Sequence, residues 1–394
     1  MAGPLVLVAT LMSVQRVLDV GALLAPLEST DIIGQHVDFE TFWSSAAALT
    51  RGEDIYQTHA QLRNLNPPLV SVLLVPFTAL DLVTAYRVFL VLMLLMALGS
   101  VLAVCRELRL RPAVTASVLL AVLAWWPLYG TLILGQIYPL LLAGLVAGWI
   151  AQRRGRPILA AVLFGITVAL KPSLAPLLLL AAAQRKWLPF QAGIAAAALA
   201  SLLGVLCAGP SSARDWLNIV TAEKVSGWVD NASLPGLAVR LGVPAATGMA
   251  FGLALLTGTL WWCGRHRDRL DPGGTAPWAV LAAALLLSPI AWHNYLLVLV
   301  PGVLVLIPLG RAGIATIALV VPVIAVTQSN EMPPPGIAAA LTQSLYCAIL
   351  ISYWVILVRA ITLPLPVSPG SPTAPPETGP QRPRIHHDIR LSAG

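Results

Sequence analysis

Long apolar runs, separated by short basic clusters, constrain this chain more than any other feature. Two examples are "VFLVLMLLMALGSVLAVC" (88–105) and "FQAGIAAAALASLLGVLCAG" (190–209), each close to the roughly 20 apolar residues that a helix needs to cross a bilayer. Of the 394 residues, 58% are hydrophobic and 10% are charged, against about 25% charged residues in an ordinary soluble domain. The pattern predicts an all-α, polytopic membrane protein.

The apolar stretches predict about ten to twelve transmembrane helices. They are residues 3–26, 67–104, 112–128, 137–151, 157–183, 188–208, 236–263, 276–290, 295–309, 312–328 and 336–358. Prolines or charges interrupt 67–104 and 157–183, so 67–104 could cross once or twice, and one piece of it could be re-entrant where protein or water satisfies its backbone. The first stretch contains Arg16 and Asp19 and has no persuasive cleavage site, which favours a membrane helix over a signal peptide.

The basic clusters predict the orientation of the chain. Clusters 105–111, 152–156, 184–187 and 264–269 together hold eleven Arg or Lys residues against two acids, as expected of cytoplasmic loops. Residues 27–66 have the opposite balance, with six acids against two arginines, which suits the outer side. The net charge of +7 is scattered over these clusters, whereas nucleic acid requires one continuous basic face, so no nucleic-acid partner is expected.

The domain organisation follows from the same pattern. We expect one transmembrane domain over 1–359, with outer loops at 27–66 and 209–235, in a multi-pass plasma-membrane protein. Residues 360–394 are rich in Pro, Gly and Ser and predict a disordered cytoplasmic tail. The four cysteines lie far apart with no C-x-x-C spacing, so no disulfide or metal site is expected from them.

Five polar residues map to one membrane face, the outer one, when the helices are counted from the basic clusters: Asp38, Asn66, Gln136, Lys171 and His293. An ionisable side chain at membrane depth costs about 2.5–3.5 kcal/mol on insertion scales and therefore usually lines a functional cavity. Four of them also have a simpler interpretation: snorkelling for Lys171, a solvated turn for His293, capping for Gln136 and a helix start for Asn66.

Together these residues suit chemistry on a lipid-borne phosphate. A carboxylate can take a proton from a hydroxyl, and Lys and His can offset charge that develops on a phosphate leaving group. The chain has no G-x-x-x-x-G-K-[ST] loop for a nucleotide, so the energy would come from a preactivated donor already in the membrane.

Four segments carry a resemblance to a known family: "DFETFWSSAAALTRGEDIY", "NPPLVSVLLVPFTAL", "GQIYPLLLAGLVAGWIAQRRGRPILAAVLFGITVALKPSLAPLLLLAAAQRKW" and "LLLSPIAWHNYLL". In this order they resemble glycosyltransferase family 87 of the GT-C superfamily over most of residues 31–310. The resemblance implies an inverting α-mannosyltransferase that moves mannose from polyprenyl-phosphate mannose to a glycolipid or lipoglycan at the outer face of the plasma membrane. It implies no cofactor, with membrane lipid, donor and acceptor as partners. No metal is expected from the residues themselves, because no acidic cluster besides the first loop offers ligands for a hard cation.

The resemblance also implies roles for individual residues. Asp38 matches the base that activates the acceptor, while Lys171 and His293 match positions near the donor phosphate. Further substrate-binding positions are Glu40, Asn66, Gln136, Tyr138, Trp292 and Asn294. Asn66, Tyr138 and Asn294 depart from the family pattern, which leaves the sugar and acceptor open.

Alternatives remain for both the base and the function. Asp31 and Glu40 are rival bases; Glu40 would point away from Asp38 on a helix but could share its face on an extended loop. A transporter or flippase of lipid-linked sugars would also carry intramembrane polar residues, although we find no convincing internal repeat. A membrane scaffold that binds a partner through its tail leaves Lys171 and His293 unexplained.

Overall fold

The computed structural model describes residues 36–267, 271, 273–323 and 335–363, and every regular element within them is helical. Extended pairing in this part is confined to one isolated antiparallel bridge between Asn231 and Trp292. The prediction of an all-α membrane protein is confirmed. The first apolar stretch, the rival base Asp31 and the tail from residue 364 onward lie outside the described residues.

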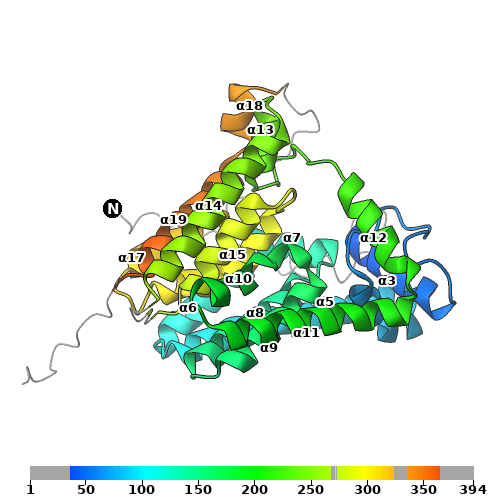
Figure 1. Ribbon diagram of the computed structural model, residues 1–394, viewed down its shortest axis with the longest axis horizontal. Coiled ribbons are helices and arrows are strands. Elements are labelled where there is room, and N and C mark those ends of the chain that lie inside the picture. The colour runs from blue at the N-terminus through cyan, green and yellow to red at the C-terminus, as the bar shows by residue number, and fades with distance from the viewer. Residues whose placement is uncertain (1–35, 268–270, 272, 324–334, 364–394) are drawn as a thin grey trace, which may run out of the picture.

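The first half of the described chain runs from a helix in the predicted first outer loop to a long apolar helix. Its helices are α3 (Val37–Thr50), α4 (Pro68–Leu74), the 3-10 helix η1 (Val75–Ala79), α5 (Leu82–Glu107), α6 (Pro112–Leu123), α7 (Trp126–Leu134), α8 (Tyr138–Arg153), α9 (Pro157–Leu170), η2 (Pro172–Leu174), α10 (Pro176–Ala183) and α11 (Trp187–Ala208). Figure 1 shows α5, α8, α9 and α11 side by side, and α5 contacts α8, α8 contacts α9, and α9 contacts α11.

The second half forms a second group of packed helices. They are α12 (Ser211–Ala222), α13 (Leu234–Arg240), α14 (Ala245–Arg265), α15 (Ala276–Leu287), η3 (His293–Leu299), α16 (Val300–Val305), α17 (Ala312–Val320), η4 (Val321–Val323), α18 (Ile337–Thr342) and α19 (Leu345–Ala360). Helix α15 packs between α14 and α19, and α10 joins this group to the first by contacting α11, α14 and α15. Figure 1 shows the two groups inclined to each other, with α7 between them.

Few of these helices are long enough to span a membrane on their own. Helices α5, α11 and α14 are long and apolar enough to cross a bilayer, and α6 with α7 would make a fourth span that is bent by 51°. Helix α11 turns Leu199 and Leu206 outward, with exposed fractions of 66% and 71%, as a lipid-facing helix does. Six further apolar helices are shorter than 18 residues, so the count of ten to twelve crossings stays a prediction.

The two interrupted stretches each consist of two pieces. In 67–104, Pro68–Ala79 is a 12-residue helical segment ahead of α5, and at 1.5 Å per residue it reaches about 18 Å, short of the roughly 30 Å hydrocarbon layer. In 157–183, α9 and α10 form a hairpin, because a cavity of about 50 Å³ is lined by Pro157 at the start of α9 and by Gln184 just beyond the end of α10. Lys171 is therefore at the far turn of that hairpin, as predicted.

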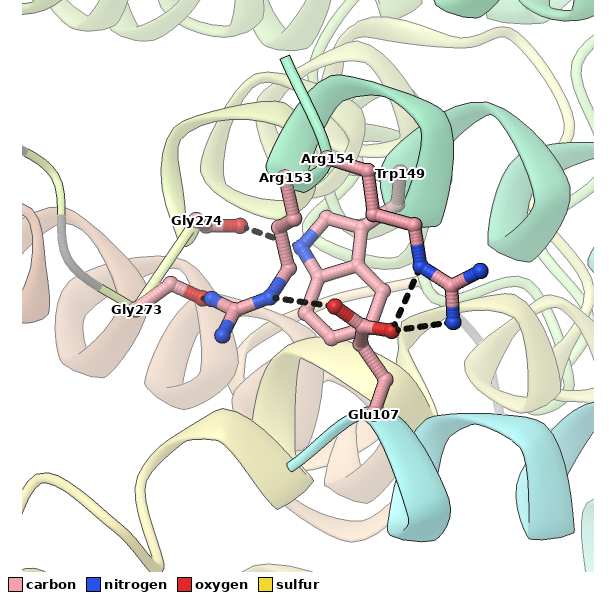
Figure 2. Close-up of polar contacts among 6 residues, drawn as sticks. All are labelled: Glu107, Trp149, Arg153, Arg154, Gly273 and Gly274. Carbon is pink, nitrogen blue, oxygen red and sulfur yellow. Dashed lines mark hydrogen bonds and ion pairs between the residues drawn. The ribbon is translucent and has the colours of Figure 1, made fainter. Parts of the chain in front are cut away.

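The first two basic clusters meet at one end of the bundle. Figure 2 shows the carboxylate of Glu107, at the end of α5, between the guanidinium groups of Arg153 and Arg154 at the end of α8, with N–O distances of 3.6 and 2.9 Å. Arg153 also donates to the carbonyl of Gly273, 2.9 Å away, which brings the chain ahead of α15 to the same place.

The other two clusters join this end through backbone contacts. Gln152 and Gln184, from the second and third clusters, line the same cavity. A Cβ on Gly264, in the fourth cluster, would lie 2.7 Å from the carbonyl oxygen of Ala183, so the ends of α14 and α10 touch. The described parts of the four clusters therefore lie at one basic end, as orientation by the positive-inside rule requires.

Candidate active site

The predicted polar residues gather at the opposite end of the bundle, and three of them lie at helix breaks. Gln136 lies between α7 and α8, Lys171 between α9 and η2, and His293 at the start of η3 after α15. Tyr138 and Arg153 are the two ends of α8, a helix of about 24 Å. The site is therefore separated from the basic end by nearly the length of a helix.

Asp38 occupies the first turn of α3, a helix outside the candidate membrane spans. Its Oδ2 accepts a hydrogen bond of 2.6 Å from the side-chain amide of Gln136. The two loops are fixed against each other because the backbone N–H of His36 donates to the carbonyl of Ile133, 2.9 Å away. Gly135 follows with a φ of 70°, and a Cβ there would collide with Phe39, so glycine permits the close approach that joins Asp38 to Gln136.

The environment of Asp38 favours a base that titrates near neutrality. Burial raises the pKa of Asp38 to about 6, while the Gln136 hydrogen bond and the positive charge of Lys171 oppose that rise. Asp38 as a whole residue is partly exposed. General bases work best with a pKa near the operating pH, and this value leaves most of the carboxylate charged at pH 7.

Glu40 does not share the position of Asp38. Both residues lie in the first turn of α3, and at about 100° per residue two positions along a helix point some 200° apart. The extended-loop arrangement, in which the two carboxylates would share a face, is therefore wrong. Glu40 remains a predicted substrate contact without a link to the other site residues in the described structure.

Asn66 positions Lys171 from the far end of the segment 27–66, the predicted first outer loop. The Lys171 ammonium donates to Asn66 Oδ1 at 3.2 Å. Asn66 is held by Asn64, whose Oδ1 accepts from the Asn66 backbone N–H at 2.9 Å, and Asn64 in turn donates to Ser45 of α3 at 3.0 Å. This chain of hydrogen bonds ties the cation to the helix that carries Asp38.

Two tyrosines fill the space between these groups. The ring of Tyr138 packs on that of Tyr295, with centroids 4.4 Å apart, and the Lys171 ammonium lies 5.8 Å from the centroid of Tyr295. Both rings are at most 3% exposed. Tyr138 was predicted as a substrate contact, and the structure makes it part of the wall beneath Asp38 and Lys171.

His293 and Asn294 converge on α7. A Cβ on Gly130 would lie 2.8 Å from His293 Nε2 and 2.6 Å from Asn294 Oδ1, and neither of these buried atoms has a hydrogen-bond partner in the described structure. The His293 ring stacks against Trp126 and Tyr346, with centroid distances of 6.4 and 5.0 Å. The histidine is thus fixed by aromatic packing, and neither of its ring nitrogens makes a hydrogen bond in the described structure.

The segment 209–235, predicted to be the second outer loop, adds residues that sequence reasoning missed. Asp230 Oδ1 lies 3.4 Å from His293 Nδ1, and Arg240 is buried beneath it with 3% exposure. Asn231, whose N-A-S sequon could have marked a glycan, is 0% exposed. It bonds to the carbonyl of Pro289 and the backbone N–H of Ala291. The one available signal was an acid in an outer segment, which does not identify a partner.

Fold and site together define a helical membrane protein with a polar site at one end. A comparison with known families matches residues 64–289, more than half of the chain, to glycosyltransferase family 87. The chain belongs to this family and is a membrane glycosyltransferase. No curated protein and no solved structure matches it. The matched range includes Asn66, Gln136 and Lys171, whereas Asp38 and His293 lie outside it, so their assignment depends on the geometry described above.

Proposed function

We propose that this transferase is an inverting α-mannosyltransferase of GT-C type that uses polyprenyl-phosphate mannose as donor. The acceptor is a glycolipid or lipoglycan at the outer face of the plasma membrane, and no cofactor or metal takes part. The observation that carries the proposal is the Asp38 carboxylate, held by Gln136 at 2.6 Å within the field of Lys171. A base beside a cation is what transfer from a phosphate-linked sugar to a hydroxyl requires.

The reaction uses Asp38 as general base. Its carboxylate takes the proton of the acceptor hydroxyl while the hydroxyl oxygen forms a bond to the anomeric carbon. The bond between that carbon and the phosphate oxygen breaks, and the electron pair leaves with the polyprenyl phosphate. Attack from the face opposite the leaving group inverts the β-linked donor and gives an α-glycoside.

Lys171 and His293 serve the donor phosphate in this proposal. Lys171 is held by Asn66, so its charge is already oriented where negative charge develops, and preorganised charges of this kind stabilise transition states most effectively. Of the remaining predicted contacts, Gln136, Tyr138, Trp292 and Asn294 surround the sugar and acceptor in this proposal, whereas Glu40 points away from Asp38 on α3. Hydrogen-bonding residues that depart from the family pattern would set which sugar hydroxyls are accepted.

The orientation of the site follows from the distribution of charge. The basic end formed by the four clusters faces the cytoplasm under the positive-inside rule, so the Asp38 end faces outward. A lipid-linked donor suits that side, since nothing in the proposed reaction depends on a nucleotide. The proposal therefore combines an outward site with a donor that is already in the membrane.

The experiment uses the purified chain in liposomes with radiolabelled polyprenyl-phosphate mannose and a glycolipid extract. Label should pass into a new glycolipid with the native chain and not with Asp38→Asn. A fully active Asp38→Asn variant would contradict the role of Asp38 and direct attention to Glu40 or Asp31. Movement of intact donor across a sealed bilayer, without transfer, would instead support a flippase.

A further inference from the structure

The second outer loop reaches the site through Asp230, which faces one nitrogen of His293. The distance from Asp230 Oδ1 to His293 Nδ1 is 3.4 Å, and the side chains are only 20% and 7% exposed. Asp230 and His293 are far apart in the sequence, so the tertiary fold brings them into contact. A carboxylate beside one ring nitrogen fixes which nitrogen of an imidazole carries the proton.

The backbone around Asp230 is clamped by a buried arginine. Arg240 Nη1 donates to the carbonyl of Trp228 at 2.8 Å and to that of Asn231 at 3.0 Å, so one nitrogen holds the chain on both sides of Asp230. Its Nε donates to Ser344 at 2.9 Å, which anchors the clamp to the chain immediately before α19. Asp230 is consequently presented from a rigid segment.

The segment that carries His293 is fixed to the same loop. The side-chain nitrogen of Asn231 donates to the carbonyls of Ser226 and Pro289 at 2.8 and 3.2 Å, and its side-chain oxygen accepts from the N–H of Ala291 at 3.1 Å. The antiparallel bridge from Asn231 to Trp292 completes the junction. Asn231 and Trp292, which this bridge pairs, are the sequence neighbours of Asp230 and His293.

The opposite nitrogen of His293 is left to meet a ligand. Neither ring nitrogen makes a hydrogen bond in the described structure, but Nδ1 faces the Asp230 carboxylate, whereas Nε2 points toward Gly130 beside the amide of Asn294. A buried imidazole resists protonation. The Asp230 carboxylate facing Nδ1 and an anionic oxygen arriving at Nε2 would together favour the doubly protonated ring, which donates its Nε2–H to that oxygen.

We propose that Asp230 is a positioning residue for His293: it holds the Nδ1 proton, orients the ring and supports its positive charge, so that Nε2–H donates to the donor phosphate. This inference rests on the proposed function, in which His293 contacts that phosphate. No bond is made or broken at Asp230, and the imidazole proton stays on the ring. The second outer loop is then part of the transferase site.

A double-mutant cycle separates this role from a purely structural one. Donor kcat/KM is measured for the native chain, Asp230→Asn, His293→Gln and the double variant, with Glu223→Gln as control for an exposed acid of the same loop. Because Asn keeps the shape of Asp, thermal unfolding checks that the fold is intact. Asp230→Asn should lower donor kcat/KM by about tenfold to a hundredfold, the size expected for a hydrogen bond to a charged group.

The coupling between the Asp230 and His293 substitutions tests the proposal. If Asp230 acts through His293, Asp230→Asn should have little further effect in the His293→Gln background. An equal loss in both backgrounds would overturn the proposal and leave Asp230 as a structural residue. Native-like activity of Asp230→Asn would overturn it as well.

A second readout does not depend on activity. Imidazole ¹⁵N spectra of the full chain, with the His293 signals identified by their absence in His293→Gln, report which nitrogen carries the proton. The native chain should show a protonated Nδ1 that changes in Asp230→Asn, and unchanged His293 signals would overturn the pairing. If the native chain transferred no sugar from polyprenyl-phosphate mannose, the proposed function would fail while these spectra still decided the pairing.

Discussion

Replacing Gln136 by alanine tests whether Asp38 is the base whose titration controls the reaction. The Gln136 amide donates to the Asp38 carboxylate at 2.6 Å and holds the pKa of Asp38 down, against the burial that raises it to about 6. A hydrogen bond to a charged group contributes about 1.5–3 kcal/mol, and 1.36 kcal/mol corresponds to one pKa unit. Without this bond, the pKa of Asp38 should rise to about 7 or 8.

The sign of the effect on rate follows from the role of a base. Only the deprotonated carboxylate can accept the acceptor proton, so kcat/KM should fall as pH drops through the pKa of Asp38. For the native chain the half-maximal point should lie near pH 6. If the variant has a pKa of about 7, its kcat/KM at pH 6 should be about fivefold lower than that of the native chain, and the two should converge near pH 9.

The assay is the initial rate of sugar transfer in liposomes over a pH range of about 5 to 9. Gln57→Ala, which removes an exposed glutamine of the same outer loop, is the matched control and should follow the native profile. The reasoning is refuted if Gln136→Ala loses the same factor at every pH, because the amide would then act on substrate binding or structure and not on the ionisation of Asp38.

Three further predictions concern single sites. Asp38→Asn should abolish transfer yet raise the unfolding temperature at pH 7, because burial raises the pKa of Asp38 from 3.8 to about 6. The folded chain then binds the proton more tightly, and native stability falls by up to about 3 kcal/mol as pH rises from about 4 to 6; an equal shift at pH 3 and pH 7 would contradict this. Gly130→Ala places a Cβ within 2.8 Å of two η3 side chains and should lower the free energy of unfolding by about 1–3 kcal/mol and remove most of the activity. Gly99→Ala, with open space around it, is the control and should be neutral or stabilising when measured by chemical unfolding. Lys171→Met should raise the donor KM by about tenfold or more, while Lys186→Met, exposed at the basic end, should not, and equal effects of both would argue against a specific phosphate contact.

The sequence could predict which residues share an end because apolar length and basic clusters set the direction of each helix. Gln136, Lys171 and His293 were placed at turns by this counting, and they lie at turns in the structure. The proline pair after Asn66 begins α4, with Pro68 at its first position, as proline tolerates. These predictions use local rules, and local rules hold here.

The pairing of these residues could not be predicted in the same way. Gln136 bonds to Asp38 and Lys171 bonds to Asn66, but any of the five polar residues could have met any other. The contact of Asp230 with His293 depends on buried Arg240, which donates hydrogen bonds to two backbone carbonyls. Because every residue has a backbone carbonyl, the sequence does not identify which ones Arg240 bonds to. Sequence patterns specify faces and ends, whereas partners are set by packing.

Two helices show how a chain with few charged residues can stabilise an anion at this end. Helices α3 and α8 both begin at the site, and neither has a side-chain hydrogen bond at its N-cap, so their first backbone N–H groups keep their positive character. That field favours the charged form of Asp38 and any negative charge that develops nearby. Lys171, set at the break after α9, adds a full positive charge held in place by Asn66. The helix breaks therefore have a chemical consequence, because they concentrate backbone dipoles and one oriented cation at the end where the proposed phosphate must leave.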